Sequence, residues 1–143
     1  MRLALAAGAA AIGMFVAAAA AQQMSDATTS GEKPYHIENG RVDKATYNGY
    51  RRYGDSCLRC HGPDGLGSSY APNLVESLKH LTQDQFSEIV INGKRDVSTS
   101  QQLVMPPFGT VEDVVLYLGD IYAYLKARSD GALGRGRPKR MEN

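Results

Sequence analysis

Cys57, Cys60 and His61 lie within five consecutive residues, Cys57-Leu58-Arg59-Cys60-His61, and these are the only two cysteines among 143 residues. The pattern C-x-x-C-H is typical of covalent haem attachment. Two thiols add to the two haem vinyl groups, and the two intervening residues set the sulfurs one helical turn apart. His61 is thereby carried over the porphyrin face, where one imidazole nitrogen can bind iron. The motif predicts one covalent haem c, attached at Cys57 and Cys60, with His61 as the proximal axial ligand.

Three other kinds of site share part of this pattern. A thioredoxin-like dithiol has C-x-x-C but needs a strand, turn and helix within an α/β fold, which this sequence does not offer. A zinc site needs one or two further ligands at short spacing, whereas His36 and His80 are each about 20 residues away. A plain disulfide leaves His61 without a role. Each explains less than haem does.

The first 21 residues have the three parts of a secretory signal peptide. Arg2 gives a basic start, an apolar Ala-rich stretch follows, and Ala19-Ala20-Ala21 precedes polar Gln22. A retained membrane anchor is the alternative, but the stretch is shorter than the ~20 strongly apolar residues of a spanning helix. We expect cleavage after Ala21, no stable membrane insertion afterwards, and a location in the bacterial periplasm.

The charge of the mature chain is balanced. Loss of Arg2 leaves 15 basic residues against 15 acidic ones, so the sequence gives no sign of nucleic-acid binding. Basic residues gather only near the C-terminus, at 135–140. This basic segment could steer a charged partner, or it could be a solvated tail without a role.

The hydrophobic pattern predicts an all-α fold with three main helices and long loops. The helices are expected at 43–56, from Thr82 to Gly93, and from Thr110 to Arg128. Thr82 with Gln85, and Thr110 with Asp113, are expected to form helix-capping pairs. Residues 62–74 and 94–109 are expected to be loops because they contain several glycines and prolines.

The boundaries follow from this pattern. We expect a signal peptide at 1–21, an N-terminal arm at 22–42, a globular domain at 43–128 and a basic flexible tail at 129–143. The globular stretch is small and has few apolar residues to fill a core, so a bound haem is expected to supply buried apolar surface.

Met105 is the candidate for the sixth, distal position on the iron. It is the only methionine inside the globular stretch of the mature chain, and Pro106-Pro107 would stiffen its loop. Core filler is the alternative role for Met105, and His80 is the alternative ligand. A His/Met pair raises the reduction potential and leaves no open position for oxygen or peroxide. For the other nitrogen of His61, the carbonyl of Pro72 is the candidate partner, unless Pro72 only shapes its loop.

The residues resemble the class I cytochromes c. Gly49, Tyr53 and Cys57, each four residues apart, are similar to that family's first helix, in which the glycine permits close crossing with the last helix. Ile121 and Tyr124 resemble the partner positions on the last helix. Ala71-Pro72-Asn73-Leu74 and Met105-Pro106 match the family's two haem loops. The resemblance implies the small cytochrome c fold for the domain at 43–128.

A narrower resemblance is to the methanol-metabolism-related c-type cytochromes. Its residues are Pro34-Tyr35-His36-Ile37, Gly49 to Tyr53, Gly67 to Pro72, Asp120 to Leu125, and Ala132 to Pro138. It implies a periplasmic carrier that takes electrons from a PQQ-dependent methanol or other alcohol dehydrogenase and passes them toward a downstream cytochrome or terminal oxidase. Members of that family carry an additional cysteine pair upstream, which this chain lacks, so no secondary disulfide is expected.

One-electron transfer is the leading function, with the loops 64–72 and 104–109 forming the docking rim. The chain would then be an electron-transfer protein and not an enzyme. The alternatives are a general periplasmic shuttle, a cytochrome subunit fixed to another dehydrogenase, and a small haem peroxidase or gas sensor in which Met105 is displaced. The last predicts a five-coordinate ferrous haem that binds carbon monoxide readily.

Overall fold

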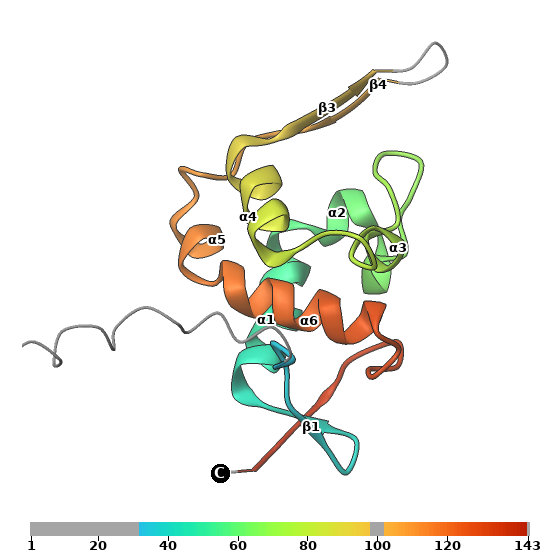
Figure 1. Cartoon of the computed structure of the whole chain (residues 1–143), viewed down its shortest axis with the longest axis vertical. Coiled ribbons are helices and arrows are strands. Elements are labelled where there is room, and N and C mark those ends of the chain that lie inside the picture. The colour runs from blue at the N-terminus through green and yellow to red at the C-terminus, as the bar shows by residue number, and fades with distance from the viewer. Residues whose placement is uncertain (1–31, 98–101, 143) are drawn as a thin grey trace, which may run out of the picture. The chain divides into compact units, whose positions relative to one another are not determined.

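The computed structural model describes residues 32–97 and 102–142, and the expected signal peptide lies outside them. Figure 1 shows a mostly helical arrangement in which the three longest helices are α1 (Lys44–Ser56), α4 (Gln83–Asn92) and α6 (Leu118–Ser129). The prediction of a helical fold with three main helices is confirmed. The shorter elements are α2 (Leu58–His61), the 3₁₀ turn η1 (Pro63–Gly65), α3 (Leu74–Ser77) and α5 (Glu112–Leu116).

The first and last helices cross in close contact at Gly49. A Cβ added to Gly49 would lie 1.8 Å from the carbonyl oxygen of Asp120 on α6, so no other residue fits there without separating the helices. Tyr53 and Ile121 pack beside this point, each 1% exposed. The sequence prediction of a glycine-mediated crossing is therefore confirmed.

Helix α6 is the centre of the core. Nine of its residues are buried, from Leu118 through Ser129, because α1, α3 and α4 all pack on it. Phe86 and Val90 of α4 point into the same core. The core side chains are Tyr35, Val42, Tyr53, Leu78, Phe86, Val90, Val114, Leu118, Ile121, Tyr122, Ala123, Tyr124, Leu125, Ala127 and Leu133.

Helix caps explain where α1 and α4 begin. Asp43 accepts hydrogen bonds from the backbone N–H and the hydroxyl of Thr46, at 2.9 and 2.7 Å. Thr82 and Gln85 form the reciprocal capping box that was predicted, at 3.0 and 3.2 Å. Gly93, with φ of 76°, ends α4.

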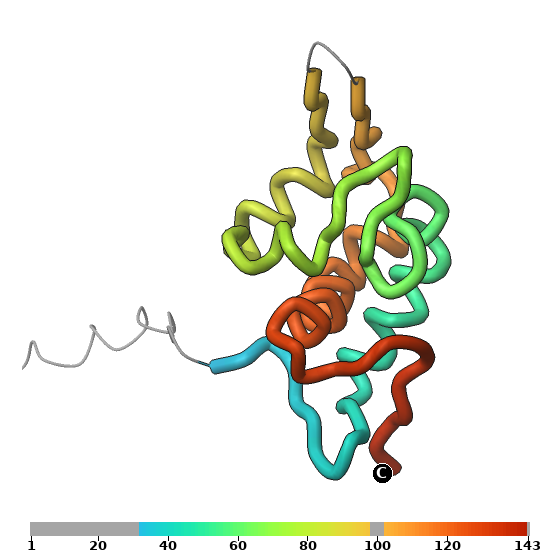
Figure 2. Tube along the Cα trace, turned by 90° about the vertical axis from the view of Figure 1, so that its right-hand side faces the viewer, coloured from blue at the N-terminus to red at the C-terminus, as the bar shows by residue number. Residues whose placement is uncertain are grey.

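A β-hairpin occupies part of the segment that was predicted to be loop. Strands β3 (Lys94–Val97) and β4 (Gln102–Met105) pair antiparallel, with Lys94 opposite Met105. The hairpin projects beyond the helices in both views (Figures 1 and 2). The loop prediction was wrong for these eight positions. All of β3 is exposed, so no alternation of apolar and polar residues marks it, and β4 alternates over only four residues.

The predicted helix from Thr110 to Arg128 is two helices. Tyr117, with φ of −111° and ψ of 22°, separates α5 from α6. The guanidinium of Arg52 lies 4.3 Å from the Tyr117 ring centroid and 2.9 Å from Asp113, which holds the break against α1. Val111, and not Thr110, occupies the N-cap position, and it has no side-chain cap. The predicted capping pair of Thr110 and Asp113 was wrong.

The segments on both sides of 43–128 pack against it. A turn at Asn39-Gly40 joins β1 (Ile37–Glu38) to β2 (Arg41–Val42), and β5 (Lys139–Arg140) pairs parallel with β2. Residues 129–143 were expected to form a flexible tail, but residues 129–142 pack against the domain, and Leu133 is buried. The reason is distant in sequence: Asp64 accepts hydrogen bonds from the backbone of Gly136 at 2.8 Å and from Arg135 at 3.2 Å.

Candidate haem site

A mainly apolar cavity brings the predicted site residues together. Its empty volume, including the solvent at its mouth, is about 980 Å³. Cys57, Cys60, His61, Pro72 and Met105 all line it. The other lining residues are Ser56, Tyr70, Ala71, Leu74, Ser77, Leu81, Ile89, Lys94, Asp96, Leu103, Val104, Pro106 and Phe108.

The two cysteines stand at the junction of α1 and α2. The Cys57 N–H still donates to Tyr53 of α1 at 2.9 Å, while the Cys57 carbonyl accepts from His61 of α2 at 3.0 Å. Cys57 and Cys60 are not joined by a disulfide. Burial, with a smaller contribution from Cys60, raises the pKa of the Cys57 thiol to about 12. Both cysteines line the cavity as separate thiols, as addition to two vinyl groups requires.

His61 is held with one ring nitrogen engaged. Its side chain is buried, and Nδ1 lies 3.0 Å from the Pro72 carbonyl oxygen, so Nδ1 carries the proton and donates it. Burial lowers the pKa of His61, although the Pro72 carbonyl acts in the opposite direction. The imidazole is thus neutral, with a free Nε2 lone pair, which is the form that ligates a metal.

The loop from Gly62 to Pro72 is folded tightly beneath His61. Gly62 and Gly67 have φ of 71° and 85°, and a Cβ on Gly67 would lie 2.8 Å from the Asn73 nitrogen. The Gly67 N–H donates to the His61 carbonyl at 2.8 Å. Ser68 donates to the carbonyl of Cys60. The glycines therefore let the chain return to the haem-attachment helix and present the Pro72 carbonyl.

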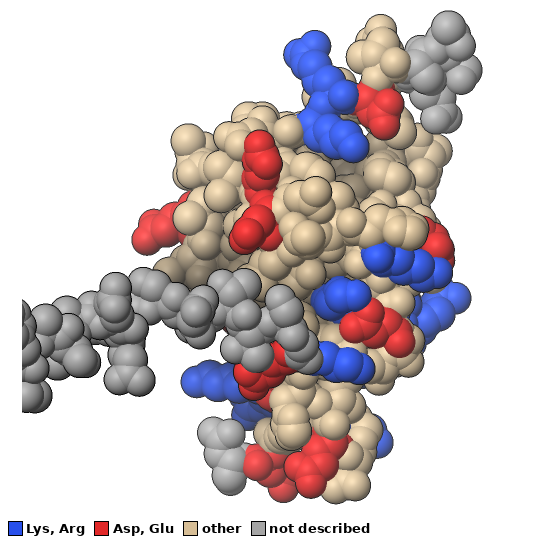
Figure 3. Space-filling view, viewed as in Figure 1, with Lys and Arg blue, Asp and Glu red and all other residues tan. Residues whose placement is uncertain are grey.

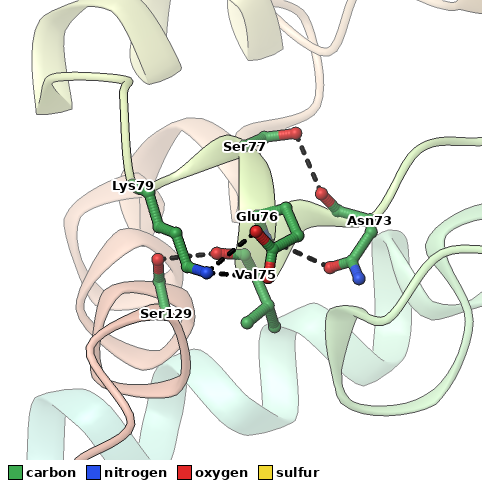
Figure 4. Close-up of polar contacts among 6 residues, drawn as sticks. All are labelled: Asn73, Val75, Glu76, Ser77, Lys79 and Ser129. Atoms are coloured by element: carbon green, nitrogen blue, oxygen red, sulfur yellow. Dashed lines mark hydrogen bonds and ion pairs between the residues drawn. The ribbon is translucent and has the colours of Figure 1, made fainter.

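Helix α3 fixes the far side of that loop (Figure 4). Asn73 caps it by accepting from the Glu76 N–H at 3.2 Å, and the Ser77 hydroxyl donates to the Asn73 carbonyl at 2.9 Å. The Ser129 hydroxyl at the end of α6 donates to the Val75 carbonyl at 2.7 Å. These bonds tie the Pro72 loop to the core helix.

Met105 is the last residue of β4, at the base of the hairpin, where it pairs with Lys94. Gly93 allows the close approach of the following chain, because a Cβ there would lie 2.7 Å from the Met105 carbonyl oxygen. His80, the alternative ligand, is exposed and is not among the cavity-lining residues. Because Met105 lines the cavity and His80 does not, Met105 is favoured as the second ligand. This ligation stays a prediction.

The hairpin also supplies cavity residues that the sequence gave no reason to choose. Because side chains alternate along a strand, Lys94, Asp96, Leu103 and Met105 share one face of the hairpin, and all four line the cavity. Val104 lines it as well, whereas Arg95 and Val97 do not. The short alternation of Leu103 and Met105 was a possible signal, but too brief to identify a strand. Tyr70, which is 74% exposed, lies in the loop 64–72 that was expected to form the docking rim, but the sequence did not single it out.

The competing sites fit the structure less well. Within residues 32–97 and 102–142, no three His, Cys, Asp or Glu side chains gather as a metal site, so zinc lacks ligands. Cys57 follows a helix and not a strand, so a thioredoxin-like setting is absent from the same ranges. Apolar walls, two thiols, an imidazole and a thioether fit a haem. No helix in the described part of the chain is long and apolar enough to cross a membrane.

Comparisons with known proteins agree with this geometry. Residues 44–125 match the family described as cytochrome C oxidase, cbb3-type, subunit III. Cytochrome c-553I of Paracoccus denitrificans is 53% identical over 74% of this chain, and the chain spans about half (47%) of that protein's length. Cytochrome c-555 of Methylococcus capsulatus is 44% identical over 66% of this chain and 72% of its own length.

A solved structure is also similar. The c-type cytochrome XoxG from Methylobacterium extorquens AM1 is 48% identical, with a TM-score of 0.69 over 76% of this chain and 67% of that one. The family match, the identities and the helical fold around a C-x-x-C-H cavity lead to one assignment. The chain belongs to the class I c-type cytochromes.

Proposed function

We propose that this protein is a one-electron carrier with a single covalent haem c. Cys57 and Cys60 would attach the haem, and His61 and Met105 would supply the two protein ligands to its iron. The observation that carries the proposal is that one cavity is lined by both thiols, the His61 imidazole and the Met105 thioether.

The protein's own groups then have defined tasks. The haem iron, when bound, supplies the one-electron couple. The Pro72 carbonyl keeps the Nδ1 proton of His61 in place, so Nε2 is the ligand nitrogen. Leu74, Leu81 and Ile89 limit water on the cavity wall. Two protein ligands leave no open coordination position, which favours electron transfer over catalysis.

The expected docking rim is supported by exposed residues at the mouth. Tyr70, from the loop 64–72, is 74% exposed, and Val104, from the segment 104–109, is 54% exposed. Acidic and basic side chains are interspersed on the face shown in Figure 3. Weak, transient contacts with a redox partner suit a small exposed rim of this kind.

The donor we propose is a PQQ-dependent methanol dehydrogenase, with a downstream cytochrome or terminal oxidase as acceptor. Segments such as 67–72 resemble the methanol-metabolism-related cytochromes, which supports this donor. The similarity of the chain to XoxG, c-553I and c-555 supports its close relation to these cytochromes. The periplasm is the proposed location because the sequence of residues 1–21 predicts a signal peptide.

The test mixes the oxidised, haem-loaded protein with purified PQQ-dependent dehydrogenases and their alcohols, and follows haem reduction by absorbance. We expect methanol dehydrogenase with methanol to reduce the haem, and omission of methanol to prevent reduction. If another dehydrogenase reduces it and methanol dehydrogenase does not, the donor is wrong while the carrier function stands. If carbon monoxide binds the ferrous protein readily, the six-coordinate carrier is wrong.

A further inference from the structure

Four tyrosine rings form a continuous row through the molecule. The ring centroids of Tyr53 and Tyr124 are 5.5 Å apart, those of Tyr124 and Tyr50 are 5.6 Å apart, and those of Tyr50 and Tyr47 are 6.2 Å apart. All three separations are those of contacting aromatic pairs. Three of the rings come from α1 and one from α6, so the row follows the crossing of these helices.

The row joins the haem attachment point to the surface. At its inner end, the carbonyl of Tyr53 accepts a hydrogen bond of 2.9 Å from the N–H of Cys57, and Tyr53 is buried. At its outer end, the half-buried Tyr47 accepts hydrogen bonds from Arg137 at 2.6 and 3.2 Å. The row of rings therefore runs from a buried residue one helical turn before Cys57 to a residue that reaches solvent.

Packing alone does not explain the phenol of Tyr124. Its side chain is fully buried, and among the described residues its hydroxyl is the buried side-chain polar atom without a hydrogen-bond partner. Phenylalanine would fill the same space without burying an unsatisfied hydroxyl, which is unfavourable. What the hydroxyl adds is a ring that is much more easily oxidised by one electron. The chain has no tryptophan that could serve instead.

We propose that Tyr53, Tyr124, Tyr50 and Tyr47 carry an oxidising equivalent from the haem to the surface when a peroxide reacts with the iron. The proposal goes beyond electron carrying and rests on the haem attachment proposed above. The reaction balances as one ferrous haem, one tyrosine, one hydrogen peroxide and one proton giving ferric haem, one neutral tyrosyl radical and two waters. Peroxide can react with the iron only while the Met105 thioether is transiently lost from it, so this is a side reaction of the carrier. Transfer of the oxidising equivalent to the surface protects the haem from it.

The environment of each ring sets where the radical rests. Burial raises the pKa of Tyr53 and raises that of Tyr124 to about 12, so neither phenol readily gives up its proton. Tyr47 reaches solvent, which can take the proton. The guanidiniums of Arg137 and Arg140, each 5.9 Å from the Tyr47 ring centroid, disfavour a protonated radical cation and so favour proton release. The radical is therefore expected at Tyr47.

The test treats the ferrous holoprotein with one equivalent of hydrogen peroxide, freezes it rapidly and records the electron paramagnetic resonance signal of tyrosyl radicals. Tyr47→Phe should remove the wild-type signal, and Tyr124→Phe should prevent the signal from reaching Tyr47. Tyr50→Phe interrupts the same row at a half-buried position and covers the case in which the Tyr124 variant folds poorly. Tyr70→Phe is the matched control because Tyr70 lines the cavity and lies outside the row.

The expected result is a tyrosyl radical in wild type and in Tyr70→Phe, with loss of the Tyr47 signal in the three row variants and faster haem bleaching in them. A signal that disappears in Tyr70→Phe and persists in Tyr124→Phe would overturn the proposal. Haem bleaching without any tyrosyl radical would overturn it as well. Covalent haem is verified separately by its pyridine haemochrome spectrum; its absence would contradict the proposed function too, whereas intact haem without a row radical contradicts only this inference.

Discussion

Substitution of two glycines on the same helix, Gly49 and Gly54, should change stability in opposite directions. Both lie within α1. A Cβ on Gly49 would lie 1.8 Å from the Asp120 carbonyl oxygen, whereas a Cβ on Gly54 would have nothing within 4 Å. Alanine has a better helix propensity than glycine by about 1 kcal/mol at either position. The difference between the two variants therefore isolates the helix crossing.

The magnitude follows from the distance that α1 must move. An ordinary contact of about 3.5 Å requires a separation of roughly 1.7 Å beyond the 1.8 Å available at Gly49. A gap of ~1 Å already forfeits up to half of the dispersion attraction across an interface, and overpacking costs about 1–3 kcal/mol or more. We expect Gly49→Ala to lower the free energy of unfolding by about 3 kcal/mol and Gly54→Ala to raise it by up to about 1 kcal/mol.

Guanidinium unfolding of the holoproteins, followed by far-UV circular dichroism, measures both free energies. Pyridine haemochrome spectra confirm equal haem content beforehand. Equal midpoints for Gly49→Ala and the wild type would refute the reasoning, since they would mean that the helices do not cross with a carbonyl against Gly49.

Three further substitutions test other contacts. Tyr124→Phe removes a buried hydroxyl that has no partner among the described residues, so the unfolding midpoint should stay equal or rise by the equivalent of about 1 kcal/mol; a clear fall would reveal a missed hydrogen bond. Asp64→Asn weakens the bonds from Gly136 and Arg135, and should cost about 1–2 kcal/mol. Burial raises the pKa of Asp64, but the Gly136 and Arg135 bonds outweigh it and hold the pKa below the ordinary aspartate value of 3.8. The contribution of Asp64 to the free energy of unfolding should thus be full above about pH 5 and shrink as the pH falls below 3.8. A difference in unfolding free energy between Asp64→Asn and wild type that stays constant down to about pH 2 would contradict this assignment. Thr82→Ala removes the capping box of α4 and should cost about 1 kcal/mol, measured by thermal unfolding.

The helices were predictable because their signals are local. Thr82 and Gln85 are three residues apart, and Gly49 and Tyr53 are separated by one helical turn, so both patterns can be read directly from the sequence. The packing of residues 129–142 could not be predicted, because it depends on Asp64, whose bond to Arg135 joins positions 71 residues apart. A Gly- and Arg-rich composition carries no trace of such a contact.

The residues of the candidate site also divide into those that the sequence could predict and those that it could not. Cys57, Cys60 and His61 share one short motif, and the structure brings Pro72 and Met105 to the same cavity. Lys94 and Asp96 could not be chosen from the sequence because only the hairpin register places them on the cavity face. The break at Tyr117 was missed because it depends on Arg52, a residue of another helix.

The near-infrared absorption of the ferric holoprotein tests the His61 and Met105 ligation most directly. A thioether bound to ferric haem iron gives a sulfur-to-iron charge-transfer band. We expect this band in the wild type and its loss in Met105→Ala, with the covalent haem retained. A band that persists in Met105→Ala, or that is absent from the wild type, would contradict the proposed carrier site.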